Sequence, residues 1–166
     1  MKRKRRFDNK KLGWLRFGKM LVAFIFVALL VFNLILGVSW VSGNSMLPTL
    51  HNGQVLISNR LEKEYEPGDI AAVRMPNGEY LVKRVIAVGG DTVDIKDGVV
   101  YINDLPESGY WVYGITEKAE SGVTYPLTLS EGQIFALGDN RAVSVDSRVY
   151  GPLSATQTRG KILFVN

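Results

Sequence analysis

An uncharged, apolar run of 22 residues, Met20 to Val41, limits what this chain can fold into more than any other feature. A helix that crosses the hydrocarbon core of a bilayer needs about 20 such residues. Asn33 is the only strongly polar side chain in the run. Trp14 and Phe17 precede the run and Trp40 lies near its end, as in the aromatic belts at membrane interfaces. The run therefore predicts a transmembrane helix over residues 20–41.

The charges on either side of this run differ in sign. Residues 1–19 contain nine Lys or Arg and one acid, a net charge of +8, whereas residues 20–166 contain 11 basic and 15 acidic residues, a net charge of −4. Basic segments next to a membrane helix stay in the cytoplasm. We therefore predict a cytoplasmic tail (1–19), one pass through the cell membrane and an extracytoplasmic domain (42–166). A basic arm can also bind nucleic acid, but the apolar run that follows argues against a nucleic-acid partner.

Two other interpretations of the apolar run are weaker. A cleaved secretory signal peptide has an apolar region of only about 7–15 residues and an A-x-A-like cleavage site. Here the run is longer, and the small-x-small candidate is Gly37-Val38-Ser39. The flanking positive charges disfavour a buried helix of a soluble protein. An uncleaved anchor is the preferred interpretation.

The turn signals in the rest of the chain predict a mostly β domain of antiparallel sheets. Two hairpins are predicted, at Pro76-Asn77-Gly78 and at Lys96-Asp97-Gly98. Residues 104–126 are predicted to be a loop, and no amphipathic helix of ten or more residues is expected after Val41. The strands are predicted at 55–57, 70–75, 80–88, 92–95, 99–102, 133–137 and 161–165.

Several catalytic classes are excluded by residue content. The chain has no Cys, which removes thiol nucleophiles, disulfides and cysteine-ligated zinc. It has one His, His51, so it has no HExxH zinc motif. No Ser has a Lys three positions later, and no P-loop or GxGxxG is present. His51 follows a polar turn and is expected to be an ordinary surface residue. No metal or other cofactor is expected.

Lys83 is unusual because it lies within an apolar strand. Leu81, Lys83, Val85 and Ala87 share one face of that strand. Such a lysine either reaches water from an edge strand or is desolvated, which lowers its pKa. A neutral amine near neutral pH is a competent general base. Alternation alone favours the first possibility.

Four segments in order resemble the sequence boxes of type I signal peptidases, which are membrane-bound serine proteases of the peptidase S26 type with a Ser/Lys dyad. The resemblance extends over residues 20–165 and is closest to the compact, Gram-positive-like form of the family. The matching segments are Ser45-Met46-Leu47-Pro48-Thr49-Leu50, Gly68-Asp69-Ile70, Lys83-Arg84-Val85, and Gly138-Asp139-Asn140-Arg141 with Ser144 and Asp146-Ser147-Arg148.

This resemblance implies a role for each of the matching residues. Ser45 would be the nucleophile, with its backbone N–H stabilising the oxyanion, and Lys83 would be the general base. Ser144 would orient the Lys83 amine. Two ion pairs would brace the site, and they are Asp146 with Arg148 and Asp139 with Arg84.

The resemblance also implies a substrate. Exported preproteins would be cut after small residues in an A-x-A-like pattern, with the substrate lying as an extended strand. Its shallow apolar pockets would be lined in part by Met46, Ala72 and Val82. Some relatives have a second oxyanion donor, a serine, where this chain has Gly43, so Ser42 or Asn44 would have to replace it. Membrane lipid is an expected partner, and the protein-export machinery is a candidate partner.

The fourth box departs from the family pattern, since N-R-D-N-S is replaced by Asn140-Arg141-Ala142-Val143-Ser144. Three other functions are alternatives to this one. A self-cleaving Ser/Lys repressor would need a DNA-binding domain where this chain has its apolar run. A pilus-assembly member of the same family would share the dyad but have specialised substrates. A non-enzymatic anchored β domain would leave a preprotein uncut.

Overall fold

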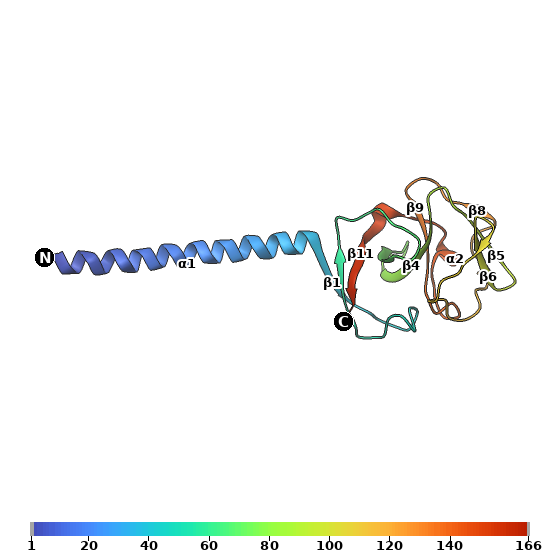
Figure 1. Ribbon diagram of the computed structural model, residues 1–166, viewed down its shortest axis with the longest axis horizontal. Coiled ribbons are helices and arrows are strands. Elements are labelled where there is room, and N and C mark those ends of the chain that lie inside the picture. Colours follow the sequence, from blue (N-terminus) through green and yellow to red (C-terminus); the bar gives the residue numbers. More distant parts are fainter. Residues whose placement is uncertain (1, 166) are drawn as a thin grey trace. The chain divides into compact units, whose positions relative to one another are not determined.

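The computed structural model describes the backbone of residues 2–165 and the side chains of residues 13–163. The chain divides into two compact units, Met1–Ile35 and Leu36–Asn166, and each is described by itself. The first unit is a single helix, and the second is built almost entirely from antiparallel strands (Figure 1). The predicted fold class, a mostly β domain preceded by an apolar helix, is confirmed.

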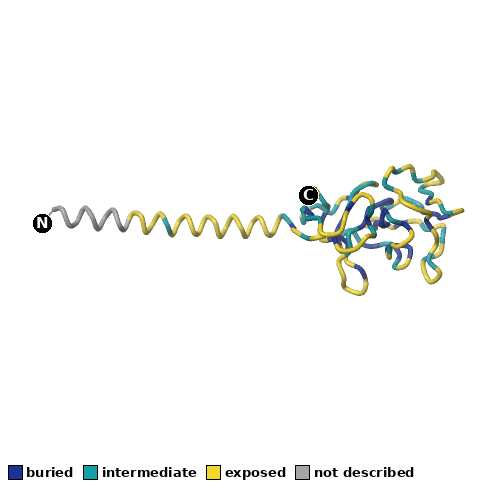
Figure 2. The backbone as a smooth tube through the Cα atoms, turned by 90° about the horizontal axis from the view of Figure 1, so that it is seen from below, coloured by how far each residue is buried: buried dark blue, intermediate teal, exposed yellow. Residues whose placement is uncertain are grey.

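The helix of the first unit, α1, extends from Lys2 to Ile35. Its part from Gly13 to Ile35 is long and apolar enough to cross a membrane, judged by length and composition. Figure 2 shows this part as almost continuously exposed, and Phe24 is 71% exposed. A helix that is apolar on all sides and is not covered by protein is typical of a membrane span.

The predicted end of the apolar helix was wrong. The helix ends at Ile35 instead of Val41, and residues 36–40 form the strand β1 (Leu36–Trp40), which pairs with β2 (Val55–Asn59). Gly37 lies opposite Ser58, and a Cβ at Gly37 would lie 2.5 Å from the Ser58 Oγ. The glycine therefore permits a close strand contact, and this tertiary pairing outweighs the apolar composition that predicts a longer helix.

Seven strands form the larger sheet of the second unit, in the order β1-β2-β11-β3-β4-β9-β10. All the pairings in this sheet are antiparallel. The strand β4 lies between β3 and β9, and it carries Lys83 of the site described below. The remaining strands of this sheet are β3 (Ile70–Arg74), β4 (Tyr80–Val88), β9 (Gln133–Leu137), β10 (Leu153–Ser154) and β11 (Thr158–Val165).

A smaller sheet contains four strands in the order β7-β6-β5-β8. These are β5 (Thr92–Lys96), β6 (Val99–Ile102), β7 (Leu105–Pro106) and β8 (Leu127–Thr128). The predicted hairpin between β5 and β6 is confirmed, because Lys96 pairs with Val99. Asp97 and Gly98 both have positive φ, 50° and 78°, as a two-residue turn of this kind requires.

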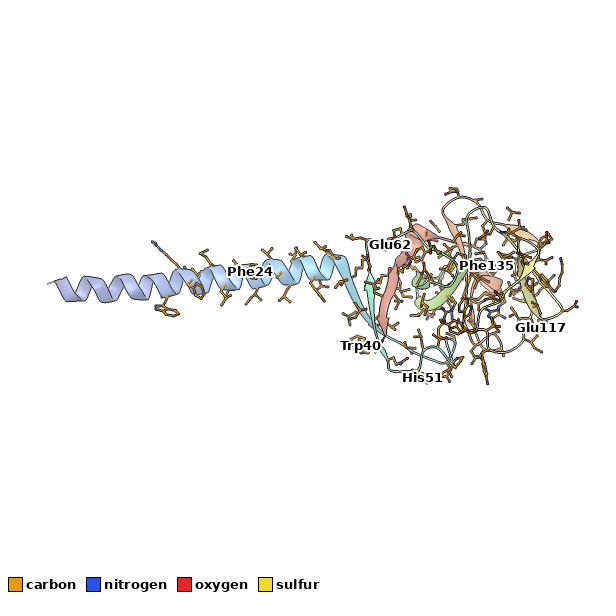
Figure 3. All side chains as sticks on the ribbon, viewed as in Figure 1. Phe24, Trp40, His51, Glu62, Glu117 and Phe135 are labelled. Atoms are coloured by element: carbon orange, nitrogen blue, oxygen red, sulfur yellow. The ribbon has the colours of Figure 1, made fainter. Side chains whose placement is uncertain are left out.

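The hydrophobic core has three clusters. One lies between the two sheets and includes Phe135, which is fully buried (Figure 3). A second lies around Val73 and Val85. The third contains Met46 and Leu56, so it anchors the segment that follows β1 to the sheet.

The predicted strands are all present, with ends that shift by up to three residues. Sequence reasoning missed β1, β8 and β10, and it missed β7 within the segment 104–126 that was predicted to be a loop. The helices after Val41 are short, as predicted. They are α2 (Ser147–Tyr150) and the 3-10 turn η1 (Ala155–Gln157).

Candidate active site

Ser45 lies in a turn that the core and a second loop hold in place. The next residue, Met46, is 2% exposed and packs in the third core cluster. The Ser45 carbonyl accepts a hydrogen bond of 3.0 Å from the backbone N–H of Asn140, and the Asn44 carbonyl accepts one of 3.2 Å from the Asn140 side chain. The turn around Ser45 and the loop after β9 are therefore bound to each other.

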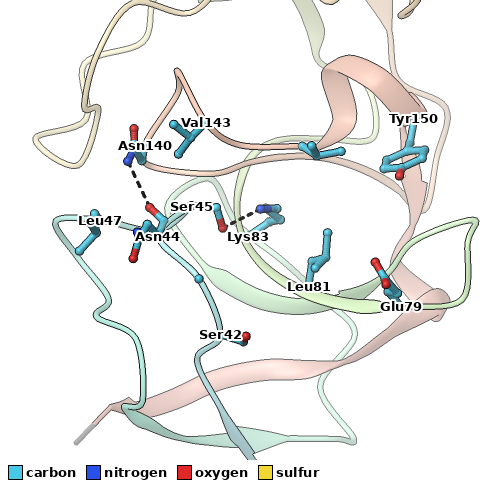
Figure 4. Close-up of a pocket in the computed structure, with 12 residues that line it drawn as sticks. Ser42, Asn44, Ser45, Leu47, Glu79, Leu81, Lys83, Asn140, Val143 and Tyr150 are labelled. Atoms are coloured by element: carbon cyan, nitrogen blue, oxygen red, sulfur yellow. Dashed lines mark hydrogen bonds between the residues drawn. The ribbon is translucent and has the colours of Figure 1, made fainter.

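Lys83 reaches Ser45 from the interior strand β4. The Lys83 Nζ donates a hydrogen bond of 2.9 Å to the Ser45 Oγ, although 38 residues separate them along the chain (Figure 4). Lys83 is 1% exposed. The interpretation of Lys83 as an edge-strand residue that reaches water is therefore wrong.

The environment of Lys83 favours a neutral amine. Burial is the largest effect and lowers the Lys83 pKa from its ordinary value of 10.5 to about 8. The negative charge of Asp146 opposes this shift, the positive charge of Arg148 adds to it, and Asp139 opposes it. An amine with this pKa, 2.9 Å from a hydroxyl oxygen, can accept that hydroxyl's proton at mildly alkaline pH.

A cavity of about 600 Å³ opens beside the two side chains (Figure 4). Apolar side chains from three segments lie on its wall, namely Leu47 from the turn around Ser45, Leu81 from β4, and Val143 and Val145 from the loop after β9. The full lining is Ser42, Gly43, Asn44, Ser45, Leu47, Glu79, Leu81, Lys83, Asn140, Val143, Val145 and Tyr150. A wall of this kind suits small apolar side chains near Ser45.

The sequence-based assignment of the pockets was mostly wrong. Gly43 does line the cavity, but Met46 is buried in the core cluster. Ala72 and Val82 line a separate cavity of about 60 Å³. Strand alternation separates Val82 from Lys83, because Lys83 lines only the active-site cavity and Val82 lines only the smaller one. Leu81 borders both cavities.

One edge of β4 is open where it borders the cavity. Residues 80–84 of β4 pair with β3 on one side. On the other side, the pairing with β9 begins only at Arg84, opposite Leu137. Within the described chain, no strand pairs with this second edge over residues 80–83. An extended peptide can therefore add to the sheet here and pass in front of Lys83.

Two buried ion pairs brace the site, as predicted. Arg84, next to Lys83, donates hydrogen bonds of 2.8 and 2.7 Å to the two carboxylate oxygens of Asp139. Arg148 donates to the Asp146 carboxylate at 2.9 and 3.0 Å. The Asp146 carboxylate also accepts a hydrogen bond from the Gly138 N–H. These contacts connect β4, the end of β9 and α2.

The predicted contact between Ser144 and Lys83 is absent. The Ser144 Oγ is buried and has no hydrogen-bond partner among the described residues. A Cβ at Gly138 would collide with the Ser144 side chain and with the Ser45 carbonyl. Gly138 therefore allows these two groups to pack over its backbone, which is where the Ser144 side chain lies.

Sequence reasoning missed several residues around the site. Arg141 is buried and donates to both carboxylate oxygens of Glu107 at 2.7 Å, which fastens the segment 104–126 to the loop after β9. Trp111, in the same segment, stacks 4.6 Å from the Arg84 guanidinium. The match of Arg141 to the fourth box was the available signal for this contact. Nothing in the sequence pattern marked Glu107 or Trp111.

His51 lies on the surface, as predicted. Its side chain is exposed (Figure 3), and it is not part of the cavity lining described above. The His51 backbone N–H donates a hydrogen bond of 2.6 Å to the Gln54 side chain. The structure therefore brings Ser45 together with Lys83 and leaves His51 elsewhere.

Comparison with known proteins identifies the family to which this chain is similar. Residues 14–166 match the family model described as signal peptidase, peptidase S26. The chain is 35% identical to signal peptidase I T and 33% identical to signal peptidase I S, both of Bacillus subtilis (strain 168). These similarities extend over 81% and 84% of this chain and over 75% and 81% of the relatives.

A solved structure is similar as well. The crystal structure of a signal peptidase I from Enterococcus faecalis V583 superposes with a TM-score of 0.50 at 30% sequence identity. The match extends over 61% of this chain and 97% of that one. Since the family model matches nearly the whole chain and the relatives are similar over most of their length, this chain belongs to the signal peptidase family, peptidase S26.

Proposed function

We propose that this chain is a membrane-bound serine endopeptidase that removes signal peptides from exported preproteins, with Ser45 as nucleophile and Lys83 as general base. Membership of the family identifies it as a serine peptidase, and hence a hydrolase. The observation that carries the proposed mechanism is the 2.9 Å hydrogen bond between the buried Lys83 amine and the Ser45 hydroxyl, at the wall of a cavity.

Acylation begins when the neutral Lys83 amine takes the proton of the Ser45 hydroxyl. The Ser45 Oγ attacks the carbonyl carbon of the scissile bond and forms a tetrahedral oxyanion. When this intermediate collapses, the protonated Lys83 gives its proton to the leaving amine, which becomes the N-terminus of the mature protein. The signal peptide stays bound to Ser45 as an ester.

Deacylation uses the same pair of side chains in the second half of the reaction. Lys83 takes a proton from a water molecule, whose oxygen attacks the ester carbonyl. The second tetrahedral intermediate then collapses with the Ser45 oxygen as leaving group, and Lys83 returns the proton to it. The signal peptide leaves as a free carboxylate and the dyad is restored.

The oxyanion needs hydrogen-bond donors beside Ser45. The Ser45 backbone N–H makes no hydrogen bond with another described residue, so it can donate to the oxyanion. Gly43 has no side-chain donor and adopts a φ of 91°. Ser42 and Asn44 both line the cavity and are the two candidates for the second donor.

Substrate would bind as an added strand on the open edge of β4. Residues 80–83 offer this edge, and Leu81 and Lys83 lie on the cavity side of it. Alternate side chains of an extended peptide would face Leu81 and Lys83, which matches the spacing of the two small residues in A-x-A. The apolar side chains Val143 and Val145 complete a wall for these residues.

Anchoring in a membrane would place this site near emerging preproteins. The apolar part of α1, Gly13–Ile35, supports an anchor, and the positive charges of residues 1–19 support a cytoplasmic N-terminus with the peptidase domain outside. Protease added to intact spheroplasts tests this orientation. It should degrade the domain 36–166, and complete protection of that domain would refute the proposed topology.

The catalytic proposal is tested by incubating a purified preprotein with the full-length protein in detergent. The wild type should release a mature protein with a new N-terminus after an A-x-A-like site. Ser45→Ala and Lys83→Ala should each lower the rate by several orders of magnitude, and the double variant should be no slower than either single one. Substantial cleavage by Ser45→Ala would refute the mechanism.

A further inference from the structure

Glu79 places a negative charge at one end of the active-site cavity. Among the described residues that line the cavity, it is the one acidic side chain. Figure 4 shows Glu79 and Tyr150 pointing into the same end of the cavity, away from Asn140 and Val143 at the other end. The mechanism proposed above does not use this carboxylate.

The charge of Glu79 is not neutralised within the described part of the chain. Glu79 takes part in none of the ion pairs found there. Its carboxylate accepts one hydrogen bond of 2.9 Å, from the neutral side chain of Asn77. An exposed carboxylate in this state can attract a cation that enters the cavity.

The position of Glu79 along β4 determines which substrate residue it meets. Glu79 immediately precedes β4, and Glu79, Leu81 and Lys83 all line the cavity. At about 3.3 Å per residue, the backbone of Glu79 lies about 13 Å from that of Lys83. A peptide paired with the open edge keeps the same period, so its residues facing Lys83 and Glu79 are four positions apart.

The A-x-A pattern fixes the direction of this peptide. With the residue before the scissile bond at Lys83 and Ser45, the small residue two positions earlier would lie at Leu81, because Leu81 is the apolar neighbour on that edge. These are the first and the third residues before the cut. By the same spacing, the fifth residue before the cut would lie opposite Glu79.

We infer that Glu79 is a specificity-determining residue, which favours preproteins with a basic side chain at the fifth position before the scissile bond. This inference rests on the proposed function of Ser45 and Lys83. Because Glu79 is exposed, we expect a preference of about two- to five-fold in kcat/KM for lysine over a neutral residue. Salt should weaken the preference, since exposed charges are screened over about 10 Å at 0.1 M ionic strength.

A purely structural role for Glu79 gives different results. Its backbone N–H donates a hydrogen bond of 3.0 Å to the Asn77 side chain, so the residue also belongs to the turn between β3 and β4. A damaged turn would slow the cleavage of every peptide by the same factor, whatever its charge. Glu79 is not among the charges that shift the Lys83 pKa, so the pH profile should stay in place when Glu79 is replaced.

The test compares three peptides with an A-x-A site that differ only at the fifth position before the cut, where they carry Lys, Gln or Glu. The full-length protein is assayed in detergent as wild type, Glu79→Gln and Glu79→Lys. Glu131→Gln serves as a matched control, because Glu131 is exposed and does not line the cavity. The wild type and the control should prefer Lys over Glu, Glu79→Gln should lose the preference, and Glu79→Lys should reverse it.

The possible results separate this inference from the function on which it rests. An equal ratio of kcat/KM values for the Lys and Glu peptides in the wild type and in Glu79→Gln would overturn the role of Glu79. A preference that is greater with the lysine at the fourth or sixth position would overturn it as well, because those side chains point away from Glu79. If the wild type cuts none of the peptides and no preprotein, the proposed function itself fails.

Discussion

Arg84, which follows Lys83 on β4, forms a buried ion pair with Asp139 through two hydrogen bonds. The guanidinium donates to both carboxylate oxygens at 2.8 and 2.7 Å, and the Asp139 side chain is fully buried. The third nitrogen of the same guanidinium donates a hydrogen bond of 2.7 Å to the carbonyl of Gly68, which lies in the turn before β3. One side chain thus fixes two segments relative to β4, namely the loop after β9 and the turn before β3.

We expect Asp139→Asn to destabilise the fold by about 3–5 kcal/mol, because it leaves the Arg84 charge buried without its partner. The unfolding midpoint in urea measures this change. Lys96→Gln is the control, because Lys96 is exposed in its pair with Asp94, and its loss should leave stability nearly unchanged. Equal effects of the two substitutions would contradict this account of the site.

The rate of cleavage should rise with pH through about 8, the value to which burial lowers the Lys83 pKa. Below that pH, the fraction of neutral amine, and with it kcat/KM, should grow about ten-fold per pH unit, and it should level off above it. Steady-state rates on one peptide between pH 6 and 10 check this. A rate that keeps rising to pH 10 would indicate an ordinary, solvated lysine.

Lys83→Met should make the protein more stable at pH 7, although it abolishes catalysis. The folded-state pKa of Lys83 lies below its ordinary value of 10.5, at about 8, so the unfolded chain binds more protons between these values and stability rises with pH there. Below about pH 8 the penalty is complete, at about 3 kcal/mol. The loss of the bond to Ser45 offsets about 1 kcal/mol of the gain.

Urea unfolding of Lys83→Met and wild type at pH 7 and pH 10 measures this effect. The advantage of the variant should be about 1–3 kcal/mol at pH 7 and should shrink at pH 10. Ser45→Ala retains the buried amine and should gain no such advantage. A variant that is less stable than wild type at pH 7 would show that the amine is not desolvated.

The variant Lys83→Arg tests whether the side chain at position 83 acts as a base or only donates a hydrogen bond. A guanidinium stays protonated, so this variant should cut preprotein at least about 10³-fold more slowly than wild type. His51→Ala should retain most of the activity, because His51 is exposed and lies outside the cavity lining. Cleavage by Lys83→Arg at near the wild-type rate would require another base.

The boundary of the peptidase unit can be tested by truncation. A fragment 36–166 keeps β1, whereas a fragment 42–166 loses it and exposes the edge of β2. We expect the longer fragment to be the more stable and the less prone to aggregate, measured by thermal unfolding and light scattering. Equal behaviour would mean that the pairing of Gly37 with Ser58 contributes little to the fold.

The sequence predicted those parts of the structure that depend on local patterns. The Asp97-Gly98 turn was predictable because it requires positive φ, and the strand around Lys83 because its residues are apolar and β-branched. The end of α1 was not, because the pairing of residues 36–40 with β2 depends on a partner about 20 positions away. An apolar segment of this length suits a helix and a buried strand equally well.

The features of the site also separate into those that could be predicted from the sequence and those that could not. The pairs around Ser45 and Lys83 followed from a family resemblance, since no spacing rule places two residues 38 positions apart at 2.9 Å. The pockets were misassigned because their walls depend on which side of β4 faces the cavity, and Val82 faces the opposite side. The contact of Ser144 depends on how closely the loop packs over Gly138, which composition does not reveal.

The open edge of β4 can accept a polypeptide segment only in an unfolded, extended conformation. A segment can fill residues 80–83 of that edge only if its own backbone N–H and C=O groups are free, and in a folded protein these groups are already paired. Finished proteins outside the membrane would therefore be spared even where they contain Ala-x-Ala, since their helices and sheets would have to unravel first. Under the proposed function, selectivity for newly exported chains would then come as much from their unfinished folding as from their sequence.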